Sequence, residues 1–235
     1  MGLLGKAVVA IWNDILPEGR ENFIEWHNRE HIPERVAIPG FLRGRRYVAE
    51  YGTPDYFTLY EAAASSVLTG PAYLERLNNP TPWTRQSTAD FRNTIRGVCE
   101  TEYSRGSGDG GFMLTLRFDA DPGRRAALEA AIIAQLEGIG RLKGVSGTHL
   151  CIADSAASGL ETAERKGRTV GVPNWIILLE GSSVAAVDAA GLALSSALFG
   201  EIAVDTLEKG LYRLEFSRVD FPADDASVLE RRLLI

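Results

Sequence analysis

Two of the three histidines in the chain, His27 and His31, lie four residues apart in the segment FIEWHNREHIPERVAIPG, which covers residues 23–40. Imidazole has an unperturbed pKa of about 6.5, so it is well suited to accept and return protons at neutral pH. The helical period predicts a helix over Pro17 to Ile32 that places both rings on its inward face. The segment therefore predicts an acid–base site.

The same inward face carries Trp26 and Glu30. Polar groups removed from water cost about 1–3 kcal/mol each unless a partner bonds them, so a buried imidazole pair needs an explanation. One explanation is a pair of core histidines bonded to backbone carbonyls. The other is a functional site, which two rings on one turn favour. In that hypothesis His31 abstracts a proton from an activated carbon or a phenol, His27 steadies the oxyanion, and Glu30 or Tyr47 lies within reach of His31.

A metal site is the first alternative, because HNREH matches H-x-x-E-H, the inverted zinc-protease signature. His27 and His31 could coordinate one zinc ion while Glu30 activates the water bound to it. That motif needs a third ligand on a following helix, but Pro33 is expected to end the helix almost at once. Acid–base catalysis without a metal or another cofactor is therefore the preferred hypothesis.

Aromatic side chains on the neighbouring predicted elements would form the walls of a pocket for a flat substrate. The candidates are Trp12, Trp26, Phe41, Tyr47, Phe57, Tyr60, Tyr73 and Trp83. The alternative for each is plain core packing. Arg46 is the candidate for neutralising a carboxylate or enolate, since a guanidinium can bind such groups through two hydrogen bonds. Arg43 and Arg45 are expected on the other side of the strand, in solvated salt bridges.

Composition narrows the class of protein. The chain has 235 residues, with 45% hydrophobic and 24% charged content, which suits one large globular domain or two small ones. Its net charge of −6 and the lack of a basic stripe argue against nucleic acid as a partner. No apolar run approaches the roughly 20 residues of a membrane span, and no leader-like segment opens the chain, so a cytoplasmic location is expected. Cys99 and Cys151 are expected to be reduced and buried.

The order of predicted elements, β-α-β-β-α-β, is the same in the two halves of the chain. The first half has strands over 6–14, 41–51, 56–62 and 94–103 and helices over 17–32, 65–79 and 83–91. The second half has strands over 112–118, 145–153, 175–180 and 211–219, with helices that begin at Asp121 and at Ser182 or Ser183. Between them, residues 105–111 (RGSGDGG) contain a formal G-x-G-x-x-G match. Because this match leads into a strand rather than a helix, a nucleotide site is rejected.

Repetition of one element order at about half the chain length predicts a tandem duplication. The predicted fold class is α+β, with two ferredoxin-like units in tandem that pack sheet to sheet as a pseudo-dimer within one chain. The predicted organisation is a first unit over residues 1–104, a linker over 105–111, a second unit over 112–220 and a C-terminal tail over 221–235.

The segments WHNREHIPER, VAIPGFLRGRRY and NNPTPWT resemble, within Trp12 to Arg96, a bacterial group of the dimeric α/β-barrel superfamily, near EthD-like proteins. The resemblance implies that the two units join their sheets into a barrel, with a pocket between each sheet and its own helices. It carries over His31, in the pattern W-x-x-x-x-H-x-P formed with Trp26 and Pro33. The first helix of the second half has neither histidine nor tryptophan, so one pocket is expected to be functional and the other structural.

Proteins of this superfamily include cofactor-free monooxygenases, lactone isomerases, lyases and haem-handling enzymes, so the fold does not name the reaction. The predicted function is cofactor-independent acid–base catalysis on a small aromatic or carbonyl-containing metabolite, as a lyase, an isomerase or cyclase, or a monooxygenase. A non-catalytic ligand-binding or stress-related protein is the alternative. A haem- or metal-binding protein, with His31 or His27 as the ligand, is the third hypothesis. Whether the chain associates further as a homodimer stays open.

Overall fold

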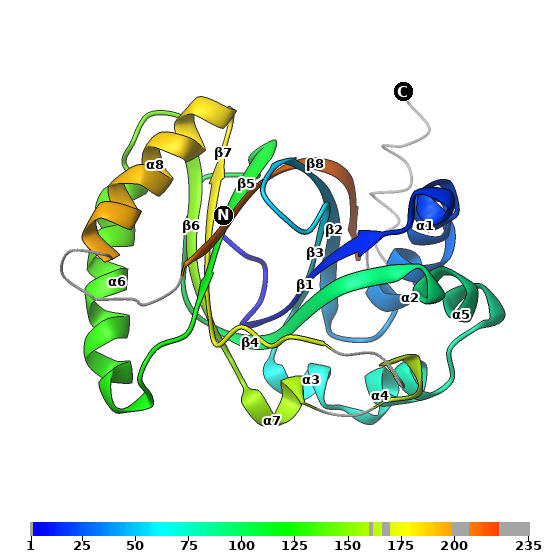
Figure 1. Cartoon of the computed structure of the whole chain (residues 1–235). Coiled ribbons are helices and arrows are strands. Elements are labelled where there is room, and N and C mark those ends of the chain that lie inside the picture. Colours follow the sequence, from blue (N-terminus) through cyan, green and yellow to red (C-terminus); the bar gives the residue numbers. More distant parts are fainter. Residues whose placement is uncertain (1, 160–161, 166–169, 199–206, 221–235) are drawn as a thin grey trace, which may run out of the picture.

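A closed antiparallel β-barrel forms the centre of the computed structural model, which describes residues 2–159, 162–165, 170–198 and 207–220 (Figure 1). Its strands are β1 (Ala7–Ile15), β2 (Phe41–Tyr51), β3 (Tyr56–Ala62), β4 (Phe91–Gly106), β5 (Phe112–Phe118), β6 (Val145–Ala153), β7 (Trp175–Gly181) and β8 (Glu208–Val219). Around the barrel they follow the order β1-β3-β2-β8-β5-β7-β6-β4, and β4 closes on β1. The expected C-terminal tail, residues 221–235, lies outside the described residues.

Each half of the chain supplies one continuous arc of the barrel. The arcs are β4-β1-β3-β2 and β8-β5-β7-β6, and the relative order of strands is the same in both. At the two seams between the arcs, β2 pairs with β8 and β4 pairs with β6. Each half therefore covers the edge strands of the other, and their backbone groups are paired only in the complete barrel. The architecture is mixed α and β, as expected.

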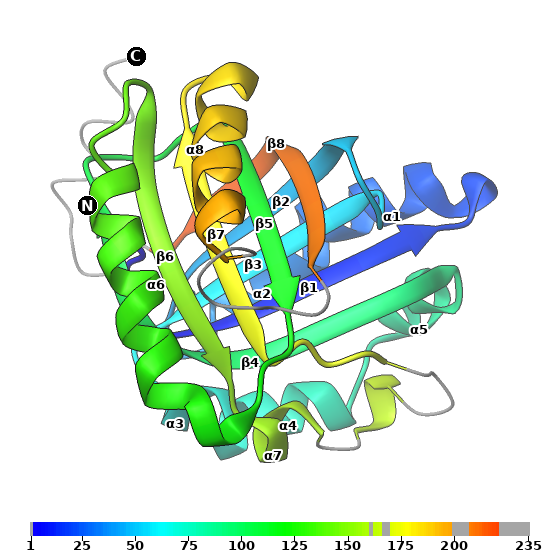
Figure 2. The same ribbon diagram turned by 60° about the vertical axis from the view of Figure 1, so that its left-hand side comes forward.

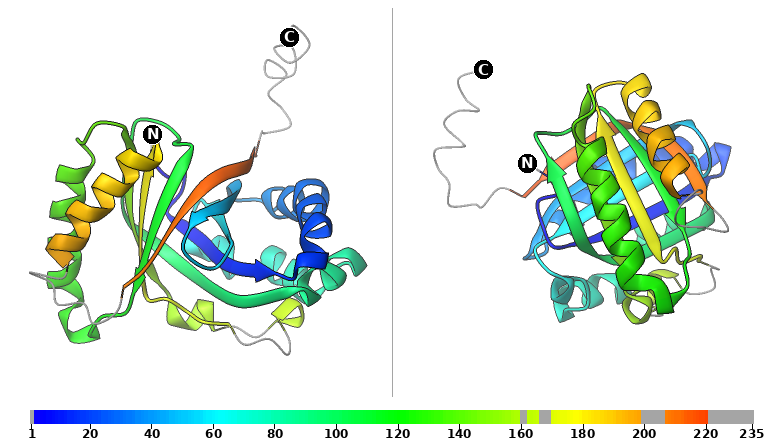
Figure 3. Two further views of the ribbon diagram at one scale, coloured as in Figure 1. Left: turned by 45° about the horizontal axis from the view of Figure 1, so that its top comes forward. Right: turned by 90° about the vertical axis from the view of Figure 1, so that its left-hand side faces the viewer.

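Helices cover opposite sides of the barrel. α6 (Arg125–Ile139) and α8 (Val184–Ala197) lie side by side over the arc of the second half (Figures 2 and 3). The first half carries α1 (Arg20–Trp26), a π-helix (His27–His31), α2 (Ile32–Val36), α3 (Ser65–Leu68), α4 (Pro71–Asn78) and α5 (Pro82–Ala89). Short pieces are α7 (Ser155–Ser158) and 3-10 turns at Pro17–Gly19, Pro122–Arg124 and Ala163–Arg165. Within the described ranges, no helix combines the length and the apolar character needed to cross a membrane.

Strand side chains alternate between a helix-covered face and the barrel interior. On β5, Leu114 and Leu116 belong to the cluster formed with α6 and α8, whereas Met113 faces the interior. Buried apolar side chains of these strands and of α6 and α8 form a large cluster on the helix-covered face of the second half. Burial of each Leu or Ile in it contributes about 1.5–3 kcal/mol. This layer therefore stabilises the barrel.

One end of the barrel interior contains a buried ion network. Glu61 pairs with Arg43 at 2.7 Å and with Arg45 at 3.0 Å, and Arg45 also pairs with Glu180. The ring of His149 lies 3.3 Å from Glu180, measured from Nε2 to Oε2. The prediction that Arg43 and Arg45 form solvated salt bridges is wrong, since both are at most 3% exposed. Closure of the barrel turns this side of β2 inward.

Three other expectations need correction. Pro33 does not end the first helix, because α2 continues through it to Val36. The helix expected over 65–79 is interrupted at Gly70 and Pro71, where α3 ends and α4 begins. β4 continues to Gly106, so the connection between the halves is shorter than the predicted linker and covers residues 107–111. Gly111 is followed by strand β5 and not by a helix, which agrees with the rejection of a nucleotide site at these glycines.

Candidate active site

A π-helix carries the two histidines. Its widened turn is closed by a hydrogen bond from the Ile32 N–H to the His27 carbonyl, five residues back. A π-turn changes the backbone register of a helix, so the chain can continue helically through Pro33, which has no N–H to donate. The His27 and His31 rings are nearly parallel, with centroids 5.5 Å apart, and they are 3% and 5% exposed. The expectation that both rings point inward is therefore confirmed.

Trp26 holds both imidazoles in place. Its ring centroid lies 4.9 Å from that of His27 and 4.2 Å from that of His31. The indole N–H is 3.3 Å from Thr84 Oγ1 on α5. Trp26 is thus a positioning residue beside the histidines, fixed by its own hydrogen bond.

A cavity of about 40 Å³ lies beside His31, between the barrel and the helices of the first half. Its lining comes from β1, the π-helix, α2, β3, α4, β4 and two further residues, Glu164 and Val170. The lining side chains on the helices and strands are Ile11, His31, Arg35, Tyr60, Tyr73, Leu77, Phe91, Thr94 and Arg96. Phe91, Thr94, Glu164 and Val170 are half-buried and form its rim. This volume is enough for one or two water-sized groups.

Two polar groups in this lining have no hydrogen-bond partner among the described residues. They are the Tyr60 hydroxyl and Arg35 Nη1, and both atoms are buried. Burial raises the pKa of Tyr60, so its hydroxyl keeps its proton at neutral pH. Unmet buried donors cost about 1–3 kcal/mol each, which an oxygen atom bound in the cavity would offset. The cavity is therefore prepared to receive a hydrogen-bond acceptor.

Two arginines that the sequence interpretation did not single out line the cavity. Arg35 pairs with Glu164, and its Nη1 lies 3.6 Å from a Glu34 carboxylate oxygen. Burial alone would lower the pKa of Arg35, but Glu164 and the neighbouring phenols outweigh it and raise that pKa. Arg96 Nη2 donates to the Tyr73 hydroxyl at 3.1 Å. The i, i+4 spacing from His31 could have indicated Arg35, whereas nothing local indicates Arg96.

His27 is buried against Phe23, with ring centroids 4.3 Å apart, and does not line the cavity. Burial lowers its pKa well below 6.5, and the positive charges of Arg46 and Arg35 lower it further. His27 is therefore neutral at neutral pH. Its Nδ1 has no hydrogen-bond partner in the described part of the chain.

Arg46 is bound to the protein rather than open to a substrate. Its Nε donates to Glu215 at 3.0 Å, and its Nη1 donates to Asn28 Oδ1 at 2.9 Å and to the Ile24 carbonyl at 3.3 Å. The side chain is 2% exposed and does not line the cavity. It therefore fixes the π-helix to β2 and β8.

Glu30 faces α5. One carboxylate oxygen accepts hydrogen bonds from Thr81 at 2.5 Å and from Thr84 at 3.4 Å. Trp83, on the same helix, donates its indole N–H to Asn22 at 2.8 Å. Glu30 and Trp83 thus anchor α5 and lie apart from the cavity lining. In the described ranges no three His, Cys, Asp or Glu side chains gather in a way that could hold a metal ion.

Trp12 and Tyr47 lie in the barrel interior, separated from the histidines by the sheet. Trp12 stacks on Phe57 at 4.8 Å and donates its indole N–H to Thr115 Oγ1 at 3.3 Å. Tyr47 also stacks on Phe57, at 5.5 Å. Of the residues proposed from the sequence, the structure brings His31, Tyr60 and Tyr73 to the cavity. It places Trp26 and His27 behind them.

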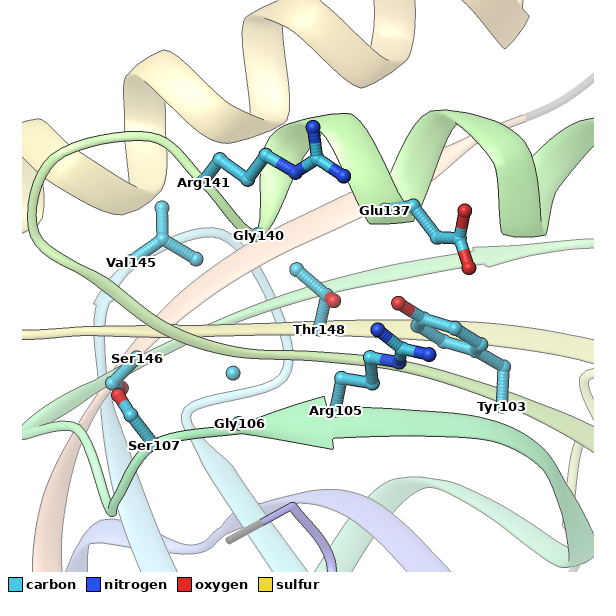
Figure 4. Close-up of a pocket in the computed structure, with 11 residues that line it drawn as sticks. Tyr103, Arg105, Gly106, Ser107, Glu137, Gly140, Arg141, Val145, Ser146 and Thr148 are labelled. Carbon is cyan, nitrogen blue, oxygen red and sulfur yellow. The ribbon is translucent and has the colours of Figure 1, made fainter.

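A larger hollow, of about 240 Å³, lies in the second half between the end of α6 and strands β4 and β6 (Figure 4). Arg105 and Tyr103 lie at one end of it, and Ser107 and Ser146 lie at the other. Its lining contains no histidine. It therefore lacks a group that exchanges protons readily at neutral pH.

Comparison with known proteins gives the fold. No family model matches the sequence, and no curated protein is detectably similar to it. An anthrone oxidase-like protein aligns with a TM-score of 0.68 at 14% identity, over 96% of this chain and 98% of that one. Two proposed monooxygenases, from Fusobacterium nucleatum and Lactobacillus acidophilus, align with TM-scores of 0.59 at 7% and 9% identity. They cover 93% and 91% of this chain, and 96% of each structure is covered.

These neighbours are dimeric α/β-barrel proteins, and the chain shares that fold. A haem group, which the resemblance had raised as a third hypothesis, does not fit beside the histidines as they lie here. Pockets for ligands of such size measure about 300–1,000 Å³. The cavity at His31 measures about 40 Å³.

Proposed function

We propose that the protein is a small-molecule enzyme of the monooxygenase type, in which His31 is the general base. One observation carries the proposal: His31, Arg35 and Tyr60 meet at one cavity, where the Tyr60 hydroxyl and Arg35 Nη1 have no hydrogen-bond partner among the described residues. Tyr60 and Arg35 would donate hydrogen bonds to a substrate oxygen, and charge developing on that oxygen strengthens both bonds. His31 would remove a proton from a carbon that is conjugated with this oxygen.

The reaction that these groups support is oxidation of an activated methylene to a carbonyl. His31 takes one proton, and the resulting carbanion reduces molecular oxygen to form a carbon-bound peroxide. His31 returns a proton to the outer oxygen, the second C–H proton leaves, the O–O bond breaks and water departs. One methylene compound and one molecule of oxygen are thus converted into one ketone and one molecule of water. Tyr60 and Arg35 stabilise the anionic oxygen in each deprotonation step.

The size of the cavity limits what it holds. About 40 Å³ accommodates the reacting carbonyl end of a substrate but not a whole ring system. The remainder of the substrate would contact the half-buried rim formed by Phe91, Thr94 and Val170. The substrate class is therefore a ketone or phenol with a C–H bond made acidic by conjugation with its oxygen-bearing carbon.

The fold supports a finer proposal about the halves. The equal strand order of the two arcs supports a tandem duplication of a ferredoxin-like unit, which makes the chain an intramolecular pseudo-dimer. The apolar layer under α6 and α8 supports loss or absence of a site in the second half. The relation to EthD-like proteins stays a prediction.

Oxygen consumption tests the function directly. Anthrone, whose methylene is made acidic by the ketone across its central ring, is the first probe because one of the aligned structures is named anthrone oxidase-like. Wild type should consume one molecule of oxygen per anthraquinone formed, and His31→Gln should be slower by about 10²–10⁴-fold. Equal turnover in wild type and His31→Gln would contradict the proposal. So would the absence of oxygen uptake by wild type with anthrone and with smaller acidic ketones, an outcome that favours a binding protein.

A further inference from the structure

The end of the barrel opposite the ion network has another cavity, which is open to solvent and which the proposed function does not use. It measures about 440 Å³ and lies between the β2–β3 turn, the start of β4 and the start of β8. A neighbouring hollow of about 180 Å³ shares Ile95, Arg117 and Glu208 with it. Arg117 is therefore common to both spaces.

Arg117 is an incompletely paired buried cation. Its side chain is 3% exposed, and its guanidinium lies over the Trp12 ring, 4.6 Å from the centroid. Nη2 donates to the Thr53 carbonyl at 3.1 Å and pairs with Glu208 at 2.8 Å. Nε and Nη1 have no hydrogen-bond partner among the described residues. Because a guanidinium carries five donors, the present contacts leave this one undersatisfied.

The ion pair between Glu208 and Arg117 contributes little stability. Its side chain is 64% exposed, and exposed ion pairs contribute about 0–1 kcal/mol. Burial lowers the pKa of Arg117 even though Glu208 opposes this effect. A carboxylate from solution could therefore replace Glu208 at little cost.

The other charged groups at this end do not compete for Arg117. Asp14 accepts hydrogen bonds from the Asp55 N–H and from Asn93 Nδ2, each at 2.7 Å. Asp119, at the smaller hollow, accepts from the backbone and side chain of Asn174 at 3.1 and 2.8 Å. Lys209 also lines the larger cavity, and its amine pairs with Asp188 at 3.4 Å.

The wall of the cavity contains one residue with a positive φ. Asn93 has a φ of 49°, a left-handed conformation that asparagine adopts more readily than most other residues. Its side-chain amide donates to Asp14 at 2.7 Å. Ile95 and Pro54 supply apolar surface in the same lining.

We propose that this end of the barrel binds a small organic carboxylate, whose anionic group takes the place of Glu208 on Arg117 and whose apolar part lies against Ile95 and Pro54. The site is separate from the cavity at His31, since the two linings share no residue. It is therefore independent of the proposed reaction.

Isothermal titration of the full chain with benzoate tests the proposal, with benzamide as the uncharged analogue. Benzoate should bind saturably, and benzamide at least about tenfold more weakly, which corresponds to about 1.4 kcal/mol. Glu208→Gln should tighten benzoate binding about threefold or more, because it removes the internal competitor. Arg117→Lys should weaken it about tenfold or more, since lysine lacks the planar fork.

Glu50→Gln is the matched control, because it makes the same charge change in the exposed Glu50–Arg213 pair between β2 and β8. It should leave benzoate binding unchanged. Equal affinity for benzoate and benzamide would overturn the proposal, as would a Glu208→Gln variant that binds benzoate no more tightly than wild type. If Arg117→Lys does not fold, Glu208→Gln decides the question, because its side chain is exposed and its loss does not open the core.

Discussion

Arg46 on β2 donates to Glu215 on β8 at 3.0 Å, across one of the two seams between the halves of the barrel. The same side chain reaches Asn28 in the π-helix, beside His27. The second half of the chain therefore helps to fix the helix that carries the candidate base, although it supplies no residue to the lining of the cavity other than Glu164 and Val170.

Replacement of Arg46 by lysine should destabilise the protein. Lysine cannot reach Glu215, Asn28 and the Ile24 carbonyl together, so acceptors at partly buried positions are left unpaired. We expect a loss of about 2–4 kcal/mol in the free energy of unfolding, measured by urea titration. Arg213→Lys, at an exposed pair, is the control and should change this free energy by about 1 kcal/mol or less. A loss at Arg46 no larger than at Arg213 would contradict this role.

Replacement of Tyr60 by phenylalanine should separate stability from function. The Tyr60 hydroxyl is buried without a partner in the described part of the chain, so its removal should raise the free energy of unfolding by about 1 kcal/mol. Oxidation of anthrone should at the same time slow by about tenfold or more, because a donor to the substrate oxygen is lost. Tyr51→Phe, at an exposed tyrosine, is the matched variant for both measurements. Full activity in Tyr60→Phe would show that this hydroxyl has no role in the reaction.

His27 should make the protein less stable in mild acid. Burial, Arg46 and Arg35 lower the pKa of His27 below its unfolded value of about 6.5, so the unfolded chain binds the extra proton first. The free energy of unfolding should therefore fall as the pH falls below about 6.5. In His27→Gln, urea titrations between pH 7 and pH 5 should show a smaller slope. An identical slope in both proteins would show that His27 does not titrate differently on folding.

Glu180 should contribute to acid denaturation at lower pH than His27 does. Burial alone would raise its pKa, but His149 and Arg45 outweigh that effect and lower the pKa from 4.5 to about 2. The stabilisation is fully present above about pH 4.5 and is lost as the pH falls toward about 2, with an amplitude of about 3 kcal/mol. Stability measured against pH should show this loss in wild type and lack it in Glu180→Gln. The exposed Glu50→Gln provides the comparison, and the same acid loss in Glu180→Gln would assign it to other groups.

The sequence predicted the bounds of the strands better than the side of the sheet on which each side chain lies. The bounds of β2, β3, β5 and β6 are confirmed, because alternating strands between glycine and proline turns are locally encoded. Trp12 and Tyr47 were assigned to the wrong side of the sheet relative to His31, because closure of the barrel depends on the pairing of β2 with β8 and of β4 with β6. Such pairing between distant strands leaves no local signal.

The π-helix shows a second limit of prediction from the sequence. Pro33 predicted the end of a helix, and the structure instead shifts the backbone register just before it. This shift brings Arg35 onto the same cavity as His31, a contact that a helix ending at Ile32 would exclude. The inward orientation of the histidines, in contrast, follows from the periodic pattern of Phe23, Trp26 and His27 and is confirmed.

Closure of the barrel also affects which surfaces of the protein can form contacts with other molecules. Each strand of the described barrel has a neighbour on both sides over much of its length, and the end of β8, residues 215–219, pairs with β2 alone. Association through the helix surfaces, in contrast, would depend on complementarity of side chains and not of backbone.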